Sequence, residues 1–492
     1  MIIGAYLFFT LYFSALIFIG IYCLSQFHLL YSYLFKKNKH CITGHQNSQT
    51  EWPTVTIQLP LYNEKYVVER LIENITKLDY PKDKLTIHIL DDSTDDTLLI
   101  SKQKVEEYQS KGFDIHLFHR LDRQGFKAGA LKESMAHLTS EFVAIFDADF
   151  VPKPDFLRKT IPHFINPSIG VVQSRWEHIN QNLSLLTEMQ ALQLNVHFTV
   201  EQQGRFLGNY LLQFNGTAGV WRTKTIEDAG GWEADTLTED LDLSYRAQLK
   251  GWQILYLEKL GSPAELPSDI FGLKSQQFRW MKGGAENAKK LLKLIWASPL
   301  QWSKKLHATS HLLSSTIFVA VFSLGIFSVP LMYLMQYVTL PTHYLQIFLA
   351  SFASIVVLYF LSNVFFIKND ENIFKIIFKF LFVFPIFMSI SMALAFHNSI
   401  AVMQGWCGKK SPFVRTPKYG EQKESFTFKK SNYFVGNLNK ISLGEALLTL
   451  YFVAALWVGS RIGVRDFFLL HIMLAFGYFS LFLYALKSRF SK

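Results

Sequence analysis

The chain has 492 residues, more than one ordinary domain needs, so we expect at least two structural units. Half of its residues are hydrophobic, and its formal net charge is +10. The basic residues gather beside apolar runs, where anionic lipid headgroups explain them, which argues against a nucleic-acid-binding protein. The three cysteines, Cys23, Cys41 and Cys407, show neither metal-ligand spacing nor a disulfide framework.

The N-terminal segment is strongly apolar. Residues 2–35 contain no Asp, Glu, Lys or Arg, and the run is too long for a signal peptide, so we predict a membrane anchor over 1–35. Residues 51–300 have the composition of a soluble domain. Further apolar runs cover 306–335, 344–367, 374–404, 443–460 and 466–487. The chain is therefore predicted to be a polytopic membrane protein with one large soluble insertion.

Basic residues beside the apolar runs predict the orientation. The basic segment after residue 35 places 36–300 in the cytoplasm, and the basic segment 405–440 belongs on the same side. Segment 374–404 lies between two cytoplasmic flanks, so we interpret it as interfacial or re-entrant, with five membrane crossings elsewhere. The alternative is six crossings with one basic loop on the outer side.

Short apolar runs alternate with helical patterns at the start of the soluble insertion. We predict strands over 54–60, 85–90, 114–118 and 142–146, and helices over 65–78, 94–110 and 127–138. This alternation is typical of a mostly parallel sheet covered by helices on both faces. In such sheets ligands bind beyond the carboxyl ends of the strands.

Polar and acidic residues follow three of these strands. They are Tyr62 and Glu64, then Asp91 and Asp92, then Asp147 and Asp149. Taken alone, Asp147 and Asp149 are also consistent with an ordinary polar strand end. Carboxylates gathered at one sheet edge repel one another unless a cation compensates, and hard oxygen ligands suit Mg²⁺ or Mn²⁺. The three strand ends together favour a metal–diphosphate site.

A second acidic group opens a predicted helix. Thr238 is a candidate N-cap, Glu239 and Asp240 lie in the first turn, and Gly251 is a natural stop. The helix dipole favours the Asp240 carboxylate, so we expect it to be ionised at neutral pH and able to act as a general base. Alternatively, these acids only complement the dipole.

An amide, a cation and an indole share one face of the next helical segment. Gln276, Arg279 and Trp280 stand at positions i, i+3 and i+4. Such a stripe makes a poor core. We expect it to bind phosphate and sugar, with Trp280 stacked on a pyranose face.

The order of these motifs resembles the processive family 2 glycosyltransferases, which include cellulose and hyaluronan synthases. The resemblance is closest to the plant cellulose synthase-like A and C proteins, which make β-1,4-linked mannan or glucomannan and glucan. It covers roughly 54–290. It rests on "LYNEK", "LDDSTDDT", "GFKAGALKE", "EFVAIFDADFVPKPDFL", "HFTVEQ", "FNGTAGVWR", "AGGWEADTLTEDLDLSYRAQLKGW", "ELPS" and "QQFRW".

The resemblance implies a domain layout. It predicts a cytoplasmic α/β GT-A (Rossmann-like, nucleotide-sugar-binding) domain over 51–265, inserted between transmembrane helices. The other predicted parts are interfacial helices over 266–300, transmembrane or interfacial helices over 301–404, a cytoplasmic gating-like loop over 405–440 and a transmembrane hairpin over 441–492. Within the loop, "SPFVRTPK" resembles the gating sequence Phe-x-Val-Thr, with Arg415 where Val is usual.

The resemblance also implies a role for each site residue. The donor nucleotide sugar would contact Tyr62, Glu64, Asp91, Asp92, Lys127, Asp147, Gln276 and Arg279. Asp147 and Asp149 would bind the metal, Asp240 would be the base with Glu239 as the alternative, and Phe413 and Thr416 would gate. The acceptor would contact Phe214, Asn215, Gly216, Thr217 and Trp280, whereas His197 is expected to be structural.

The expected activity is inverting transfer of a hexose, with Mg²⁺ or Mn²⁺, from GDP-mannose or UDP-glucose to a growing β-1,4-linked glycan. The glycan would pass through the membrane helices of the same chain, in a bacterial inner membrane or a Golgi membrane. One alternative is nonprocessive transfer of one sugar to a lipid, as in ceramide glucosyltransferase. A transporter or scaffold with a degenerate domain is disfavoured, because every acid of the site is present.

Overall fold

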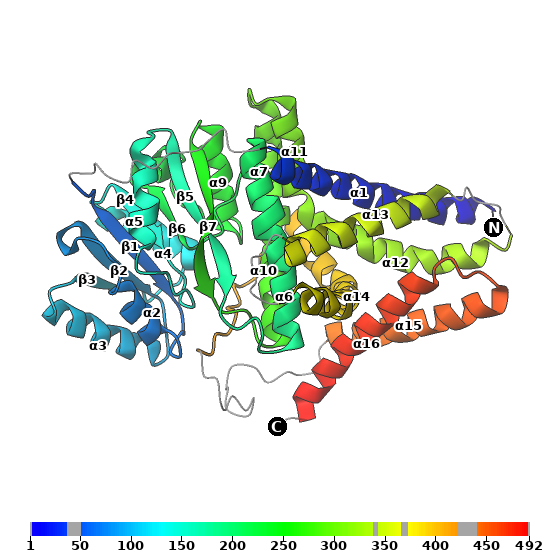
Figure 1. The fold of residues 1–492 in the computed structure, drawn as a ribbon. Coiled ribbons are helices and arrows are strands. Elements are labelled where there is room, and N and C mark those ends of the chain that lie inside the picture. Colours follow the sequence, from blue (N-terminus) through cyan, green and yellow to red (C-terminus); the bar gives the residue numbers. More distant parts are fainter. Residues whose placement is uncertain (1, 37–50, 338–342, 366–371, 421–439, 491–492) are drawn as a thin grey trace.

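The structure, a computed structural model, describes residues 2–36, 51–337, 343–365, 372–420 and 440–490. A sheet-containing domain lies on one side and a group of long helices on the other (Figure 1). Helix α10 (Ile270–Ala297) stands between the two parts (Figure 1). The predicted insertion of an α/β domain between apolar helices is confirmed.

The sheet has seven strands in the order β3-β2-β1-β4-β6-β5-β7. Their bounds are β1 Val55–Leu61, β2 Leu85–Asp91, β3 Asp114–His119, β4 Phe142–Ile145, β5 Ile169–His178, β6 Gly219–Arg222 and β7 Gln253–Ala264. Strand β6 runs antiparallel to β4 and β5, and the other pairs are parallel. The four predicted strands and their mostly parallel pairing are confirmed, whereas β5, β6 and β7 were not predicted.

Strand β4 is buried on both faces of the sheet. Its alternate residues belong to two separate cores. Phe142 and Ala144 pack with helices α2 (Val68–Ile75) and α3 (Thr97–Ser110), and Val143 and Ile145 pack with helices α4 (Phe126–Ser134) and α9 (Glu239–Leu249). This two-sided burial explains the continuous apolar run. It also fixes the point at which the chain leaves the sheet, immediately before Asp147.

The four predicted helices of this domain begin and end close to the predicted positions. They are α2 Val68–Ile75, α3 Thr97–Ser110, α4 Phe126–Ser134 and α9 Glu239–Leu249. The short helices α5 Phe156–Thr160 and α8 Thr223–Asp228 were not predicted. Between β5 and β6 the chain forms α6 Leu185–Val196, a π-helical turn His197–Gln202 and α7 Gln203–Gly208. This excursion leads toward the long helices.

The long helices are α1 Ile2–Phe35, α12 Ile317–Leu334, α13 His343–Phe360, α14 Ile373–Trp406, α15 Lys440–Ile462 and α16 Phe468–Phe490, and the shorter α11 spans Trp302–Leu312. Among the described residues, five segments are long and apolar enough to cross a membrane: 6–35, 314–334, 373–406, 440–462 and 468–487. The count of five agrees with the prediction, but the membership differs.

Helix α14 is one of these five, although we predicted its segment to be interfacial or re-entrant. In α13, the apolar stretch Leu349–Val364 is shorter than the predicted span 344–367, whose end lies outside the described residues. Figure 1 views α14 close to its own axis, so it crosses α1 and α12 steeply. The interfacial or re-entrant placement of α14 therefore stays a prediction.

Several orientation signals lie outside the described residues. They are the basic segment at 37–41, the loop at 338–342, the basic flank at 368 and residues 421–439 of the predicted 405–440 loop. The cytoplasmic placement of the α/β domain therefore also stays a prediction.

Candidate active site

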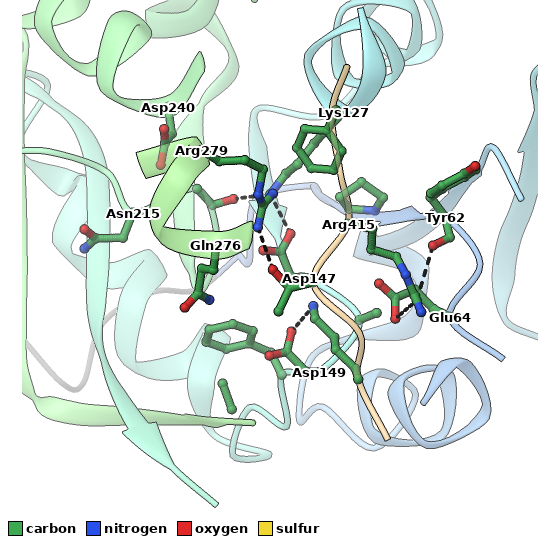
Figure 2. A pocket seen from close by; sticks show the side chains of 18 of the residues that line it. Tyr62, Glu64, Lys127, Asp147, Asp149, Asn215, Asp240, Gln276, Arg279 and Arg415 are labelled. Atoms are coloured by element: carbon green, nitrogen blue, oxygen red, sulfur yellow. Dashed lines mark hydrogen bonds and ion pairs between the residues drawn. The ribbon is translucent and has the colours of Figure 1, made fainter. Parts of the chain in front are cut away.

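A cavity of about 180 Å³ lies at the carboxyl ends of β1, β2 and β4. Helix α10 and the segment after α14 also line it. Fifteen predicted site residues line this cavity: Tyr62, Glu64, Asp92, Lys127, Asp147, Asp149, Asn215, Gly216, Glu239, Asp240, Gln276, Arg279, Trp280, Phe413 and Thr416. Figure 2 shows Tyr62 and Glu64 on one side, Asp240 and Asn215 on the other, and Asp147 with Arg279 between them.

Asp147 is held at the centre of the cavity. Its backbone N–H donates to Thr217 Oγ1 at 2.8 Å, and Lys127 Nζ donates to its Oδ1 at 2.5 Å. Lys127 also donates to the carbonyl oxygen of Gly216 at 2.9 Å. Burial favours the neutral acid, but the charges of Lys127 and Lys418 outweigh burial and lower the pKa of Asp147. The carboxylate is thus anionic at neutral pH.

Asp149 pairs with a cation from a distant part of the chain. Lys418, which follows α14, donates its Nζ to Asp149 Oδ1. Burial of the ammonium is unfavourable, but the carboxylates of Asp149 and Glu64 outweigh it and raise the pKa of Lys418. The segment after α14 is therefore fastened directly to the predicted metal-binding acids.

The β1 and β2 ends of the cavity carry two further cation contacts. Arg123 lies 3.2 Å from the centre of the Tyr62 ring. Arg120 forms a two-pronged ion pair with Asp92, at 2.8 and 2.6 Å. These contacts fix side chains that face the cavity.

Glu64 is buried beside Arg415, whose Nη1 lies 2.7 Å from Glu64 Oε2. Burial raises the pKa of Glu64 to about 7, although Lys418 and Arg415 oppose the shift. The unusual Arg415 thus pairs with a residue of the site.

Helix α10 and the segment after α14 contact each other above the cavity. Arg279 Nη2 donates to Thr416 Oγ1 at 3.0 Å, and its guanidinium lies 4.5 Å from the centre of the Phe413 ring. Phe413 in turn stacks on Phe126 at 5.5 Å. Both residues predicted to gate therefore lie over the cavity.

Asp240 opens α9 at the far side of the cavity. Burial and the nearby Glu239 carboxylate raise the pKa of Asp240 to about 7, so the expectation that the helix dipole keeps it fully ionised at neutral pH is wrong. Gly216 lies very close to it: a Cβ there would be 3.0 Å from Asp240 Oδ2, and the φ of +79° also favours glycine.

Thr238 precedes α9, as predicted, but its side chain has another partner. The hydroxyl accepts a hydrogen bond from Asn287 Nδ2 of α10 at 2.9 Å instead of capping α9. Gly283 allows this close approach, since a Cβ there would lie 2.5 Å from Thr238 Oγ1. Helix α10, which carries Gln276, Arg279 and Trp280, is thereby fixed against the start of α9.

Three predicted site residues lie behind the cavity wall. The Asp91 carboxylate accepts from Ser93 N–H at 2.8 Å and from Ser101 Oγ at 2.7 Å and is fully buried, which corrects its placement beside the donor. Phe214 packs in the core against Trp221, and Thr217 holds the Asp147 backbone. Their contacts support the site from below.

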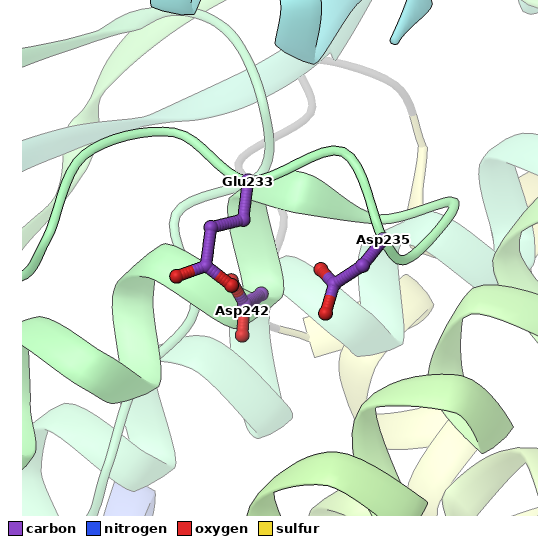
Figure 3. A group of neighbouring side chains, drawn as sticks. All are labelled: Glu233, Asp235 and Asp242. Atoms are coloured by element: carbon purple, nitrogen blue, oxygen red, sulfur yellow. The ribbon is translucent and has the colours of Figure 1, made fainter.

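The residues at the cavity suit a hard divalent cation. Asp147 and Asp149 both reach it from the end of β4, and Mg²⁺ or Mn²⁺ commonly binds through one or two carboxylates plus substrate phosphates. Another acidic cluster, Glu233, Asp235 and Asp242, lies around the first turn of α9 (Figure 3). Lys290 contacts all three acids, at 2.6, 2.9 and 3.0 Å, so this cluster is an ion-pair network that ties α10 to α9.

Sequence reasoning missed several residues that line the cavity. Lys418 and Arg415 stand inside the quoted "SPFVRTPK", yet neither received a role there. Arg123 follows the third strand, and Trp176 lies in the unpredicted β5. Cations near strand ends were the available signal for Arg123; Trp176 offered none.

A second cavity, of about 350 Å³, continues from the first toward the long helices. It is lined by residues of α1, α6, α10, α12, α13 and α14. Six residues line both cavities and define what we call the neck: Trp176, Leu194, Asn215, Thr238, Asp240 and Trp280. The predicted base thus lines both the first cavity and the second.

Comparison with known proteins identifies the class of this domain. The model of the family "Glycosyltransferase like family 2" matches residues 53–283. A solved structure of a mannosyltransferase from Pyrobaculum calidifontis, in complex with GDP-Man and Mn²⁺, has a similar fold, with a TM-score of 0.53 and 18% identity. The similarity covers 81% of this chain and all of that one. Residues 53–283 therefore form a family 2 glycosyltransferase domain with the GT-A fold.

The most similar curated proteins include plant glucomannan synthases. This chain is 42% identical over 253 residues to a probable glucomannan 4-beta-mannosyltransferase of Arabidopsis thaliana, which covers 50% of this chain and 46% of that protein. It is 44% identical over 245 residues to one from Oryza sativa subsp. japonica, covering 49% and 45%. The chain spans about half the length of the curated relatives it matches.

Proposed function

We propose that this protein is a membrane-embedded inverting glycosyltransferase that polymerises hexose from a nucleotide-diphosphate sugar into a β-1,4-linked glycan. The observation that carries the proposal is the neck, where Asp240 lies between a cavity lined by Asp147, Asp149 and Lys127 and a second cavity among the long helices. The names of the plant relatives support mannose as the sugar. The GDP-Man in the structurally similar mannosyltransferase supports GDP-mannose as donor. UDP-glucose is the alternative donor.

The donor occupies the first cavity in this proposal. Tyr62 and Glu64 lie at the nucleoside end with Asp92, and Lys127, Arg279 and Gln276 lie near the diphosphate. A divalent metal on Asp147 and Asp149 would add electrostatic stabilisation of the leaving diphosphate. The Mn²⁺ in the structurally similar mannosyltransferase supports this group without deciding between Mn²⁺ and Mg²⁺.

Transfer is a single displacement at the anomeric carbon. An acceptor hydroxyl at the neck loses its proton to Asp240 as its oxygen bonds to the sugar. The bond from that carbon to the diphosphate oxygen breaks, and the nucleoside diphosphate leaves with the negative charge. Attack from the side opposite the leaving group inverts the configuration and gives a β-linked product. Trp280 offers an aromatic face to the acceptor sugar.

The second cavity supports a growing chain as the acceptor. It leads from Asp240 into the helices that are apolar enough to span a membrane, which suits a glycan that leaves the site along this path. A lipid acceptor could enter the same cavity between helices, so transfer of one sugar to a lipid is the second candidate.

The test uses the full chain in lipid nanodiscs with radiolabelled GDP-mannose or UDP-glucose. The product is separated into material that is insoluble in ethanol and material that chloroform–methanol extracts. Ethanol-insoluble label released by an endo-β-1,4-mannanase supports the proposal. Label found only in the lipid extract would replace it with the second candidate, and the absence of transfer from either donor would contradict both.

A further inference from the structure

We infer that Trp176, and Asn215 oriented by a partly buried His197–Glu201 pair, form a second acceptor subsite on the membrane side of the neck. This inference rests on the proposed function, because it assigns part of the acceptor path. It gives His197 a positioning role, in place of the purely structural one expected from the sequence. Its ligand class is a β-1,4-linked hexose chain.

Two residues of the neck each carry a buried donor without a partner. Among the described residues, the side-chain Nδ2 of Asn215 and the indole Nε1 of Trp176 are buried and have no hydrogen-bond partner. Asn215 is only 8% exposed, and both residues line both cavities. Unpaired buried donors are costly and therefore rare in folded proteins. Sugar hydroxyl and ring oxygens are acceptors that would satisfy both groups.

The orientation of the Asn215 amide is set from behind. Its Oδ1 accepts from Gln202 Nε2 at 3.1 Å and faces His197 Nε2 at 3.3 Å. Its backbone N–H donates to Gln173 Oε1 at 2.9 Å. Because Gln202 donates to the oxygen, the NH₂ group is the side of the amide that remains for a ligand.

His197 is itself held by a charged neighbour. Its Nδ1 lies 2.8 Å from Glu201 Oε2, one helical turn along the π-helical segment His197–Gln202. Burial would favour the neutral acid, but His197 and Arg205 outweigh it and lower the pKa of Glu201 to about 2. The carboxylate thus fixes the imidazole that touches Asn215. π-Helical turns are frequent at functional sites.

Trp176 supplies a rigid aromatic surface at the neck. Its ring contacts Phe150 and Phe198, each at a centroid distance of 5.3 Å. Both neighbours are almost fully buried, so the indole is fixed in place. An indole face with an N–H at its edge can stack on a pyranose ring and donate to a hydroxyl. Together with Trp280, the neck offers two tryptophans to successive sugars.

The test separates acceptor binding from donor binding in the full chain in nanodiscs. Three variants are compared: Trp176→Phe, which keeps the ring and removes the N–H; His197→Leu; and the conservative His197→Gln. The partly buried His163, which lies outside both cavities, gives the matched control His163→Leu. The probes are β-1,4-linked mannohexaose and cellohexaose, and the readouts are hexaose Kd by calorimetry and the KM values for hexaose and donor.

We expect Trp176→Phe and His197→Leu each to raise the hexaose Kd and KM about tenfold, as for one lost hydrogen bond, with donor KM changed less than about twofold. His197→Gln can still donate to Asn215, so it should recover most of the loss. His163→Leu should leave both constants unchanged. The donor KM separates this pattern from a general loss of structure.

Unchanged hexaose binding in both variants, or equal rises in donor and hexaose KM, would overturn the subsite. The subsite would also be overturned if neither mannohexaose nor cellohexaose bound to the parent protein. If hexaose binds but no sugar is transferred from either donor, the proposed function fails while the subsite stands, so the two failures are distinguishable.

Discussion

Lys418 forms an ion pair with Asp149 across 269 positions of the chain. The pair joins the segment after α14 to the end of β4, where the predicted metal-binding acids lie. Arg415 pairs with Glu64 from the same segment, and Thr416 accepts from Arg279. Displacement of this segment would therefore uncover Asp149 and Glu64 together.

Metal dependence is the first prediction. If Asp147 and Asp149 hold a divalent cation at the diphosphate, excess EDTA should abolish sugar transfer, and added Mn²⁺ or Mg²⁺ should restore it. Asp149→Ala should lower kcat/KM by roughly 100-fold or more at any metal concentration, because the cation loses a ligand. The exposed Asp122 gives the control Asp122→Ala, which should behave as the parent. Full activity of Asp149→Ala in excess chelator would mean that Asp147 and Asp149 bind no metal and only form an ordinary polar end to β4.

Substitution of the proposed base is the second prediction. Asn has nearly the shape of Asp but cannot take a proton, so Asp240→Asn should lower kcat by about 10²- to 10⁴-fold. Donor affinity, measured by calorimetry with the nucleoside diphosphate, should change little, because the base acts on the acceptor. Glu239→Gln should have a much smaller effect on kcat. If the two effects are reversed, Glu239 is the base.

The pH dependence follows from the raised pKa of Asp240. Only the deprotonated carboxylate accepts a proton, so kcat/KM should rise about tenfold per pH unit below about 7 and level off above it. Glu239→Gln removes a neighbouring negative charge that raises this pKa, so the rise should move to lower pH. A profile that stays flat between about pH 5.5 and 8 would exclude Asp240 as the titrating base.

The elements that were predictable are those with strong local patterns. The apolar runs of β1 to β4 and the acids after them were readable, because parallel strands bring their carboxyl ends to one edge. Strand β6 has four residues, Gly219–Arg222, too few to show a pattern, and its antiparallel pairing depends on β4 and β5. Roles that depend on neighbours could not be predicted from the sequence. Ser101 donates a hydrogen bond to the Asp91 carboxylate, and burial raises the pKa of Asp240.

Membrane topology can be tested at a native cysteine. Cys407 is exposed at the end of α14, whereas Lys418, at the predicted gating segment, is largely enclosed. In a Cys41→Ser background with buried Cys23, a membrane-impermeant maleimide should leave Cys407 unlabelled in intact cells and label it after permeabilisation. Labelling in intact cells would place this end of α14 on the outer side.

The measurement that tests the central claim most directly is the length of the product at low acceptor consumption. The full chain is given a large excess of β-1,4-linked mannohexaose over enzyme, with labelled GDP-mannose, and products are sized when under about 5% of the primer has reacted. A path from the donor cavity through the neck keeps the chain bound between additions, so the account predicts long, mannanase-sensitive chains beside unextended primer. Products only one sugar longer than the primer, or label confined to a glycolipid, would contradict it.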